Sequence, residues 1–214
     1  MEISVLKKYF LILRANVKHN FLPHFALSVL LLIIAPVIFG TANLNAKTAA
    51  IPLEMFIALV GIILLTPVFL PDQQKEIREV VEAKYTNQNI IYLVRIVIAV
   101  LTMLLLISGF VFYMKQSGCK FNDVSYITGT FDGSLFLGAL GLFSYGVSGS
   151  ISIGYMVPMV YYILNLFGGS EHLGNLYLFS MTQGSFEEKY WLLGAGISLI
   201  ILTLLMKSIG KKTR

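Results

Sequence analysis

Long apolar stretches separated by short polar connections make up most of this chain of 214 residues. A helix needs about 20 mainly apolar residues to cross the hydrocarbon core of a bilayer, because each residue adds about 1.5 Å of length. The stretches approach or reach this length. They predict an all-α, polytopic integral membrane protein whose six transmembrane helices form a single domain over residues 1–214. The predicted spans are 21–40, 51–70, 90–114, 133–150, 154–169 and 190–206.

The fourth and fifth predicted spans share one uncharged stretch, residues 133–169. As a single helix this stretch would measure roughly 55 Å, against roughly 30 Å for the hydrocarbon core, so we expect it to cross twice. Gly149, Gly154 and Pro158 interrupt the helical pattern and place the turn within residues 148–158. The preceding residues, 115–132, are polar and predict a loop.

Three segments outside the predicted spans combine apolar and polar or charged positions. Residues 1–20 mix apolar and basic positions and predict an interfacial amphipathic helix. Residues 170–189 form a longer connection between the fifth and sixth spans, with apolar content of their own. Residues 72–84 form a charged island after the second span, in which apolar positions recur at helical spacing and predict a short amphipathic helix. A plain solvated loop is the alternative for this island.

Composition and charge fix the class and the orientation. Charged residues make up 13% and hydrophobic residues 57% of the chain, which excludes an ordinary soluble domain. The net charge of +5 does not indicate nucleic-acid binding, because the basic residues cluster near the termini and beside apolar runs. With the N-terminus inside, twelve basic residues fall on the inner side and four on the outer side. We therefore expect both termini, and the charged island, in the cytoplasm, and residues 170–189 outside.

The charged island and the order of spans resemble the permease subunit of a type-2 ATP-binding cassette (ABC) transporter. In that family the loop after the second span carries an acidic residue, a Thr/Ile-Glu pair, an apolar pair and a basic residue that enters the third span. Glu76 stands where the family usually has glycine. The matching or neighbouring positions here are Asp72, Glu76, Ile77, Arg78, Glu79, Val80, Val81 and Arg95.

The resemblance implies a mechanism and partners. Residues 71–89 would be the coupling loop, whose helix binds a separate ABC ATPase subunit, expected in two copies. A second permease, identical or paralogous, would complete the unit. ATP and Mg would bind the ATPase, so this chain would be no enzyme and hold no cofactor. Gly210-Lys211 lacks the remaining residues of a phosphate-binding loop.

The transported cargo and the cellular location are expectations that rest on the low charge of the spans and on the family resemblance. A path poor in charge suits export of a hydrophobic or amphipathic peptide, drug or lipid-like molecule, and the expected location is a bacterial cytoplasmic membrane. A non-transporting membrane immunity or scaffold protein is the alternative function. An intramembrane protease would need a catalytic set, whereas the adjacent pair Glu187-Glu188 has no histidine in register.

Several residues within the spans are candidates for a substrate path. Glu54 lies in the first turn of the second span, where we interpret it as a solvated helix start near the outer surface, with substrate contact as the alternative. Tyr161, Tyr162 and Asn165 add hydrogen-bonding groups to the fifth span. In the resembling family the first, second and fifth spans often face the other permease, so these residues are candidates for the translocation route.

Small residues recur every four positions around the fourth span. Such spacing lets helices approach closely in lipid, and a substrate path along this face is the alternative. The residues are Ser144, Ser148 and Ser152 in one row and Gly146, Ser150 and Gly154 in another. The histidines lack the spacing of metal ligands, so no metal site is predicted. Cys119 is the only cysteine, which excludes an internal disulfide.

Overall fold

The computed structural model describes residues 21–73 and 88–209, and within them the chain is all-α, as predicted. In chain order the elements are α2 (Leu22–Phe39), α3 (Ala46–Met55), η2 (Ile57–Leu59), α4 (Val60–Leu65), η3 (Thr66–Gln73), α6 (Gln88–Gln116), α7 (Asp123–Ser148), α8 (Ile151–Leu173), η4 (Gly174–Leu176), α9 (Ser180–Gln183) and α10 (Glu187–Ile209), where η marks a 3-10 helix. Six helical segments are long and apolar enough to span a membrane: Leu22–Phe39, Ala46–Pro71, Ile90–Gln116, Asp123–Ser148, Ile151–Leu176 and Glu187–Ser208.

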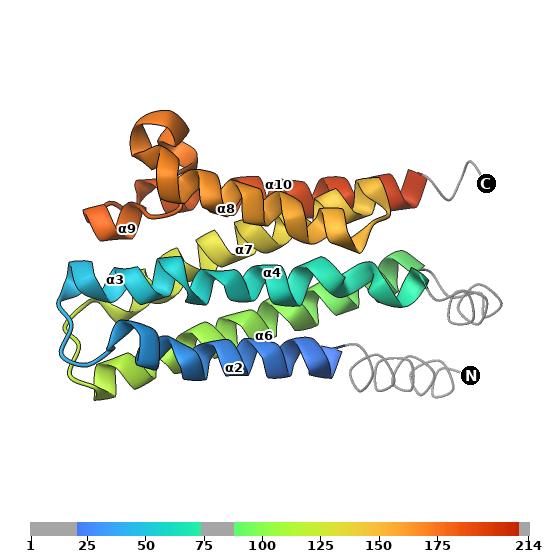
Figure 1. Ribbon diagram of the computed structural model, residues 1–214. Coiled ribbons are helices and arrows are strands. Elements are labelled where there is room, and N and C mark those ends of the chain that lie inside the picture. Colours follow the sequence, from blue (N-terminus) through green and yellow to red (C-terminus); the bar gives the residue numbers. More distant parts are fainter. Residues whose placement is uncertain (1–20, 74–87, 210–214) are drawn as a thin grey trace.

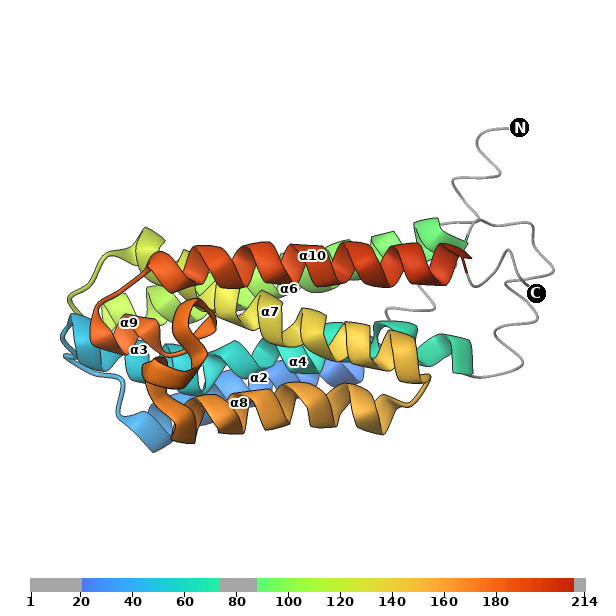
Figure 2. The ribbon, with the colours of Figure 1, turned by 90° about the horizontal axis from the view of Figure 1, so that it is seen from above.

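The long helices run along one common axis with α4 and α7 in the middle (Figures 1 and 2). α2 and α6 cover one side of this central pair, and α8 and α10 cover the other. The central pair approaches very closely at Gly61 of α4, where a Cβ atom would lie 1.8 Å from the backbone oxygen of Ser134 in α7. Only glycine fits there, so this position fixes how α4 and α7 cross.

The second membrane-length segment is not a regular α-helix. The Asn45 side chain accepts a hydrogen bond from the Thr48 N–H and so caps the start of α3. Near Phe56 the helix changes to 3-10 geometry, with the Leu59 N–H bonded to the Phe56 carbonyl. This change leaves the Met55 carbonyl without its usual partner four residues on.

The fourth helix, α7, begins ten residues before the span expected from residue 133. The Asn122 side chain caps it by accepting from the Ser125 N–H, so most of the expected loop 115–132 is helical. α7 has the lowest mean hydropathy of the six segments, yet 72% of its most apolar window is buried inside the protein. A helix enclosed by other helices does not need apolar side chains on every face. α7 can therefore contain a charged residue type such as Asp132, which is buried.

The turn between α7 and α8 lies in the predicted interval. α7 ends at Ser148, and Gly149 follows with a φ of 68°, a left-handed conformation that favours glycine. α8 begins at Ile151.

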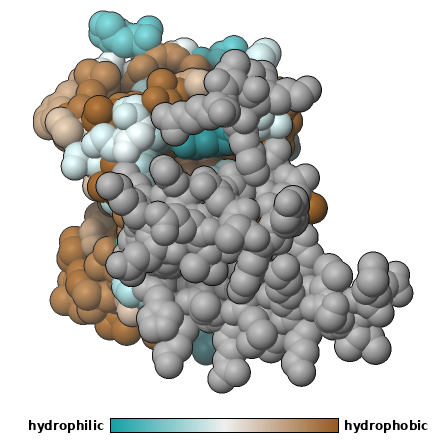
Figure 3. Space-filling view, turned by 90° about the vertical axis from the view of Figure 1, so that its right-hand side faces the viewer, coloured by the Kyte–Doolittle hydropathy of each residue, from teal (hydrophilic) through white to brown (hydrophobic). Residues whose placement is uncertain are grey.

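The outer faces of the bundle are apolar. Exposed aliphatic and aromatic side chains line α2, α6, α8 and α10, and in the end-on view of Figure 3 hydrophobic side chains show along one edge of the bundle. Exposed aromatic residues gather where α6 and α8 end and α10 begins, all at one end of the bundle, as is typical of a membrane interface. These residues are Phe112, Tyr113, Phe167, Tyr190 and Trp191.

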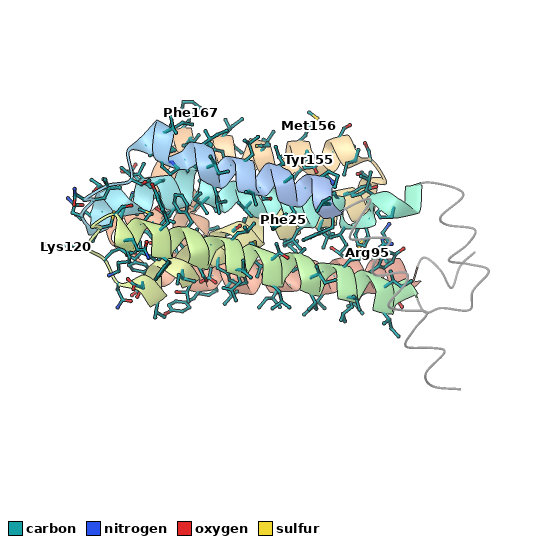
Figure 4. All side chains as sticks on the ribbon, turned by 90° about the horizontal axis from the view of Figure 1, so that it is seen from below. Phe25, Arg95, Lys120, Tyr155, Met156 and Phe167 are labelled. Atoms are coloured by element: carbon teal, nitrogen blue, oxygen red, sulfur yellow. The ribbon has the colours of Figure 1, made fainter. Side chains whose placement is uncertain are left out.

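That aromatic-rich end also carries α3 and α9, and we call it the α9 end. The described parts of the chain begin at Phe21, break at Gln73 and Gln88 and stop at Ile209, all at the opposite end (Figure 1). Figure 4 shows the same polarity, with Lys120 and Phe167 towards the α9 end and Arg95 towards the other. The expected interfacial helix 1–20 lies outside the described residues.

Candidate functional site: a buried ion pair beneath the α8–α10 connection

A buried ion pair joins the second and sixth membrane-length segments at the α9 end. Glu54 of α3 and Lys189 of α10 are each 2% exposed, and Glu54 Oε1 lies 2.6 Å from Lys189 Nζ. Burying either charge alone carries a large desolvation cost, which the partner offsets. The interpretation of Glu54 as a solvated helix start is therefore wrong. The partner is 135 residues further along the chain, so the sequence around Glu54 gave no sign of it.

Glu54 also holds the connection between α8 and α10, which we define as residues 174–186. Its Oε1 accepts a hydrogen bond of 2.9 Å from the Met181 N–H, and its Oε2 accepts one of 3.0 Å from the Thr182 N–H. These amides belong to the short helix α9, whose backbone would otherwise lack partners in a buried position. One carboxylate thus neutralises a lysine and satisfies two backbone donors.

Lys189 reaches this site across the face of α7. Its Nζ also donates to the Leu178 carbonyl in the connection. Gly129 and Gly133 of α7 leave room for the lysine: a Cβ at Gly129 would lie 3.5 Å from Lys189 Cγ, and one at Gly133 would lie 3.8 Å from Nζ. Two glycines one turn apart on α7 therefore leave the space that the Lys189 side chain occupies.

A second buried carboxyl group accompanies the pair. Asp132, beside Gly133 on α7, is 5% exposed, and its charge interacts with that of Lys189. Tyr177 of the connection is also buried. Burial raises the pKa of the Tyr177 phenol, and the negative charge of Glu54 raises it further. This end of the bundle therefore contains a compact polar interior of two carboxyl groups, one ammonium and several phenols.

The predicted fifth-span residues hold the other side of the same connection. Asn165 is fully buried, where its Oδ1 accepts from the Leu178 N–H and its Nδ2 donates to the Tyr161 carbonyl. The Tyr161 hydroxyl donates to the Leu176 carbonyl. The Tyr162 hydroxyl donates to the Met55 carbonyl that the change to 3-10 geometry released.

The structure thus brings all four candidate path residues together at one site. Each contacts the protein's own backbone or Lys189, so their observed role is to fasten the connection and α8 onto the second span. Lys189 and Asp132 complete this site and were not among the predicted residues. The sequence predicts Lys189 at the end of the outer connection 170–189 and Asp132 at the end of the polar loop 115–132, because both residues border apolar runs.

Most of the predicted coupling residues lie outside the described part of the chain. The gap at residues 74–87 contains Glu76, Ile77, Arg78, Glu79, Val80 and Val81. Asp72 lies within η3, one residue before its end at Gln73. Arg95 is described: it is buried in α6 and donates from Nη1 to the Val68 carbonyl at 3.1 Å. That carbonyl stands three residues before Pro71, which has no N–H to complete a 3-10 hydrogen bond.

The six small residues do not share one helix, because the chain turns at Gly149. Gly146 packs against Thr203 of α10, and Gly154 packs against Tyr145 and Thr66. The Ser144 and Ser148 hydroxyls donate to carbonyls one turn earlier in α7, at Leu140 and Ser144. Ser150 is the residue before α8, and Ser152 is exposed to the surroundings.

Within residues 21–73 and 88–209, no three His, Cys, Asp or Glu side chains gather as a metal site. Cys119 is buried with a free thiol, which donates to the Thr41 carbonyl. Comparisons with models of protein families, with curated proteins and with solved structures found no match for this chain.

Proposed function

We propose that this chain is the membrane-embedded permease subunit of an ATP-driven transporter of the type-2 ABC class. A separate ATPase subunit binds the charged island 72–84, and a second permease completes the unit. The observation that carries the proposal is the position of the island's two flanks. Gln73 and Gln88 lie at the end of the bundle where the described chain begins and stops. A soluble partner that binds the island would therefore act at this end of the bundle.

The bond between Arg95 and Val68 supports the proposal. It joins α6 to η3, which are the two helices that flank the island. A partner that moves the island pulls on both helices, and this bond makes them move together. Arg95 is also the position at which the resemblance places a basic residue.

The orientation belongs to the same proposal. Most basic residues belong to sequence segments that adjoin Phe21, Gln73, Gln88 and Ile209, and these four residues lie at the end of the bundle opposite α9. On this proposal that end faces the cytoplasm and the α9 end faces outward. The apolar outer faces of α2 and α8 suit a hydrophobic or amphipathic cargo that reaches the protein from the bilayer. We propose export of such a cargo.

The proposal is tested by affinity purification of the full chain from its native cells in mild detergent, with the co-purifying proteins identified. We expect an ATP-hydrolysing subunit to co-purify with the wild-type chain. Val80→Asp, which places a charge on the apolar side of the predicted coupling helix, should abolish this association.

Val124→Asp is the matched control. Val124 is 70% exposed at the start of α7, at the α9 end, so the same charge there lies on the side opposite the island. This variant should keep the ATPase subunit. Recovery of the wild-type chain without any ATPase would overturn the permease proposal and favour the non-transporting immunity or scaffold protein.

A further inference from the structure

The buried cluster at the α9 end has one more negative group than it has positive groups. Glu54, Asp132 and Lys189 are all at least nine-tenths buried. In the part of the chain that the structure describes, Lys189 forms an ion pair with Glu54, and Asp132 forms none. With every group ionised, one lysine would face two carboxylates.

Geometry decides which carboxylate Lys189 neutralises. The ammonium already contacts Glu54 Oε1 and the Leu178 carbonyl, and both contacts lie towards the connection. Asp132 approaches from α7, next to the Gly133 position that faces Nζ. A second ionised carboxylate is unfavourable in a buried site unless it has its own partner. A bound proton removes that cost.

We propose that Asp132 is a proton-binding site. A proton on Asp132 keeps Lys189 paired with Glu54, and Glu54 then holds the α8–α10 connection against the bundle, which we call the closed form. When the proton leaves for the solution at the α9 end, the new carboxylate attracts Lys189 and weakens its pair with Glu54. Glu54 then holds Met181 and Thr182 with no counter-charge. The connection loosens from the bundle.

The direction of the pH dependence follows from the number of protons that each form binds. The closed form binds one more proton than the open form, so low pH favours closure and rising pH favours opening. While Asp132 is protonated only in the closed form, the ratio of open to closed rises about tenfold per pH unit. This inference concerns the α9 end alone and does not depend on the identity of the transported cargo or of the ATPase.

Other charged or titratable groups also lie around the cluster. They are Lys47 on α3, Tyr126 on α7, Tyr162 on α8, Tyr177 in the connection and Glu188 on α10. The Asp132→Asn variant separates their contributions from that of Asp132. His172 is a further titratable group, exposed at the end of α8, and therefore needs a control of its own.

The proton itself is tested by infrared spectroscopy of the purified full chain in lipid nanodiscs. We expect the carbonyl stretching band of a protonated carboxylic acid at mildly acidic pH, and its loss in Asp132→Asn. Asp123→Asn is the matched control, since Asp123 lies on the same helix but is exposed and paired with Lys115 at 2.7 Å. If Asp132→Asn does not fold, carboxyl-13C aspartate in the wild-type chain should shift the band. A band that persists in Asp132→Asn, or that does not shift with the label, overturns the proposal.

Closure is tested by hydrogen exchange at the Met181 and Thr182 amides. Protection factors, corrected for intrinsic exchange at each pH, should fall with rising pH in the wild-type chain and in His172→Gln. In Asp132→Asn they should stay high and independent of pH. Equal pH dependence in the wild-type chain and Asp132→Asn, or its loss in His172→Gln, contradicts the proposed control by Asp132.

Discussion

The Tyr162 hydroxyl donates to the Met55 carbonyl at 2.5 Å, across 107 residues of sequence. Met55 lies where the second membrane-length segment changes from α to 3-10 geometry, and its carbonyl loses the ordinary helical partner there. In an apolar medium such a carbonyl must find a donor within the protein. A phenol from α8 supplies it, so the irregular helix and its neighbour depend on each other.

Tyr162→Phe should therefore destabilise the bundle by about 1–3 kcal/mol, since it leaves the partly buried Met55 carbonyl without its donor while keeping the ring. The measurement is thermal unfolding of the purified chain in detergent. Tyr190→Phe is the control: Tyr190 is 72% exposed, so the same loss of a hydroxyl should leave the midpoint almost unchanged. Equal shifts in the two variants would contradict the assigned role of this bond.

Lys189→Met should cost about 3–5 kcal/mol, because it leaves Glu54 as a buried charge without its partner. The double variant Lys189→Met with Glu54→Gln should lose less than the sum of the two single variants, because it removes both charges together. The readout is the free energy of unfolding in a double-mutant cycle. The comparison pair is Lys115 and Asp123, which is partly exposed and should couple by only about 0.2–1 kcal/mol.

Gly61→Ala should disrupt the crossing of α4 and α7, since the added Cβ would collide with the Ser134 backbone oxygen. Backbone cannot move aside as a flexible side chain does, so we expect a loss of at least 1–3 kcal/mol, on the order of other overpacked sites. Gly109→Ala is the control within a helix, because nothing lies within 4 Å of its Cβ position. That variant should be neutral or more stable by about 0.5–1 kcal/mol. Similar losses in both would show that the close approach does not limit stability.

Arg95→Met should weaken the tie between α6 and η3 and, on the proposed function, lower substrate-stimulated ATP hydrolysis by the assembled transporter. We expect the stimulation of ATP hydrolysis by substrate to fall markedly while the basal rate of hydrolysis is retained. Lys120→Met provides the comparison, since Lys120 is exposed at the α9 end (Figure 4). ATPase assays in nanodiscs measure both variants. Unchanged stimulation in Arg95→Met would argue against transmission through this residue.

The sequence allowed the element types, most of the spans and the turn at Gly149 to be predicted, because these depend on local rules: length, hydropathy and the preference of glycine for positive φ. The start of α7 could not be predicted this way. Hydropathy measures compatibility with lipid, and α7 is surrounded mainly by protein, so its polar first turns at Asn122 and Asp123 read as a loop.

The site was only half visible in the sequence for a similar reason. Glu54, Tyr161, Tyr162 and Asn165 stood out as polar residues in apolar surroundings. Their partners are backbone groups and one lysine brought near by the folding of the connection, and no local spacing encodes such contacts. Lys189 follows Glu187 and Glu188 and is therefore predicted to belong to the connection before the sixth span rather than to a buried site.

The enclosure of α7 has a consequence for biogenesis. A nascent helix that carries Asp132 and many small polar residues gains little by entering lipid alone, whereas α2 and α6, which precede it, are far more apolar. Its polar groups pack against α8 and α10, and both of these helices are made after α7. The middle of the bundle is therefore completed late, and a ribosome stalled before α10 should leave α7 exposed to quality-control proteases.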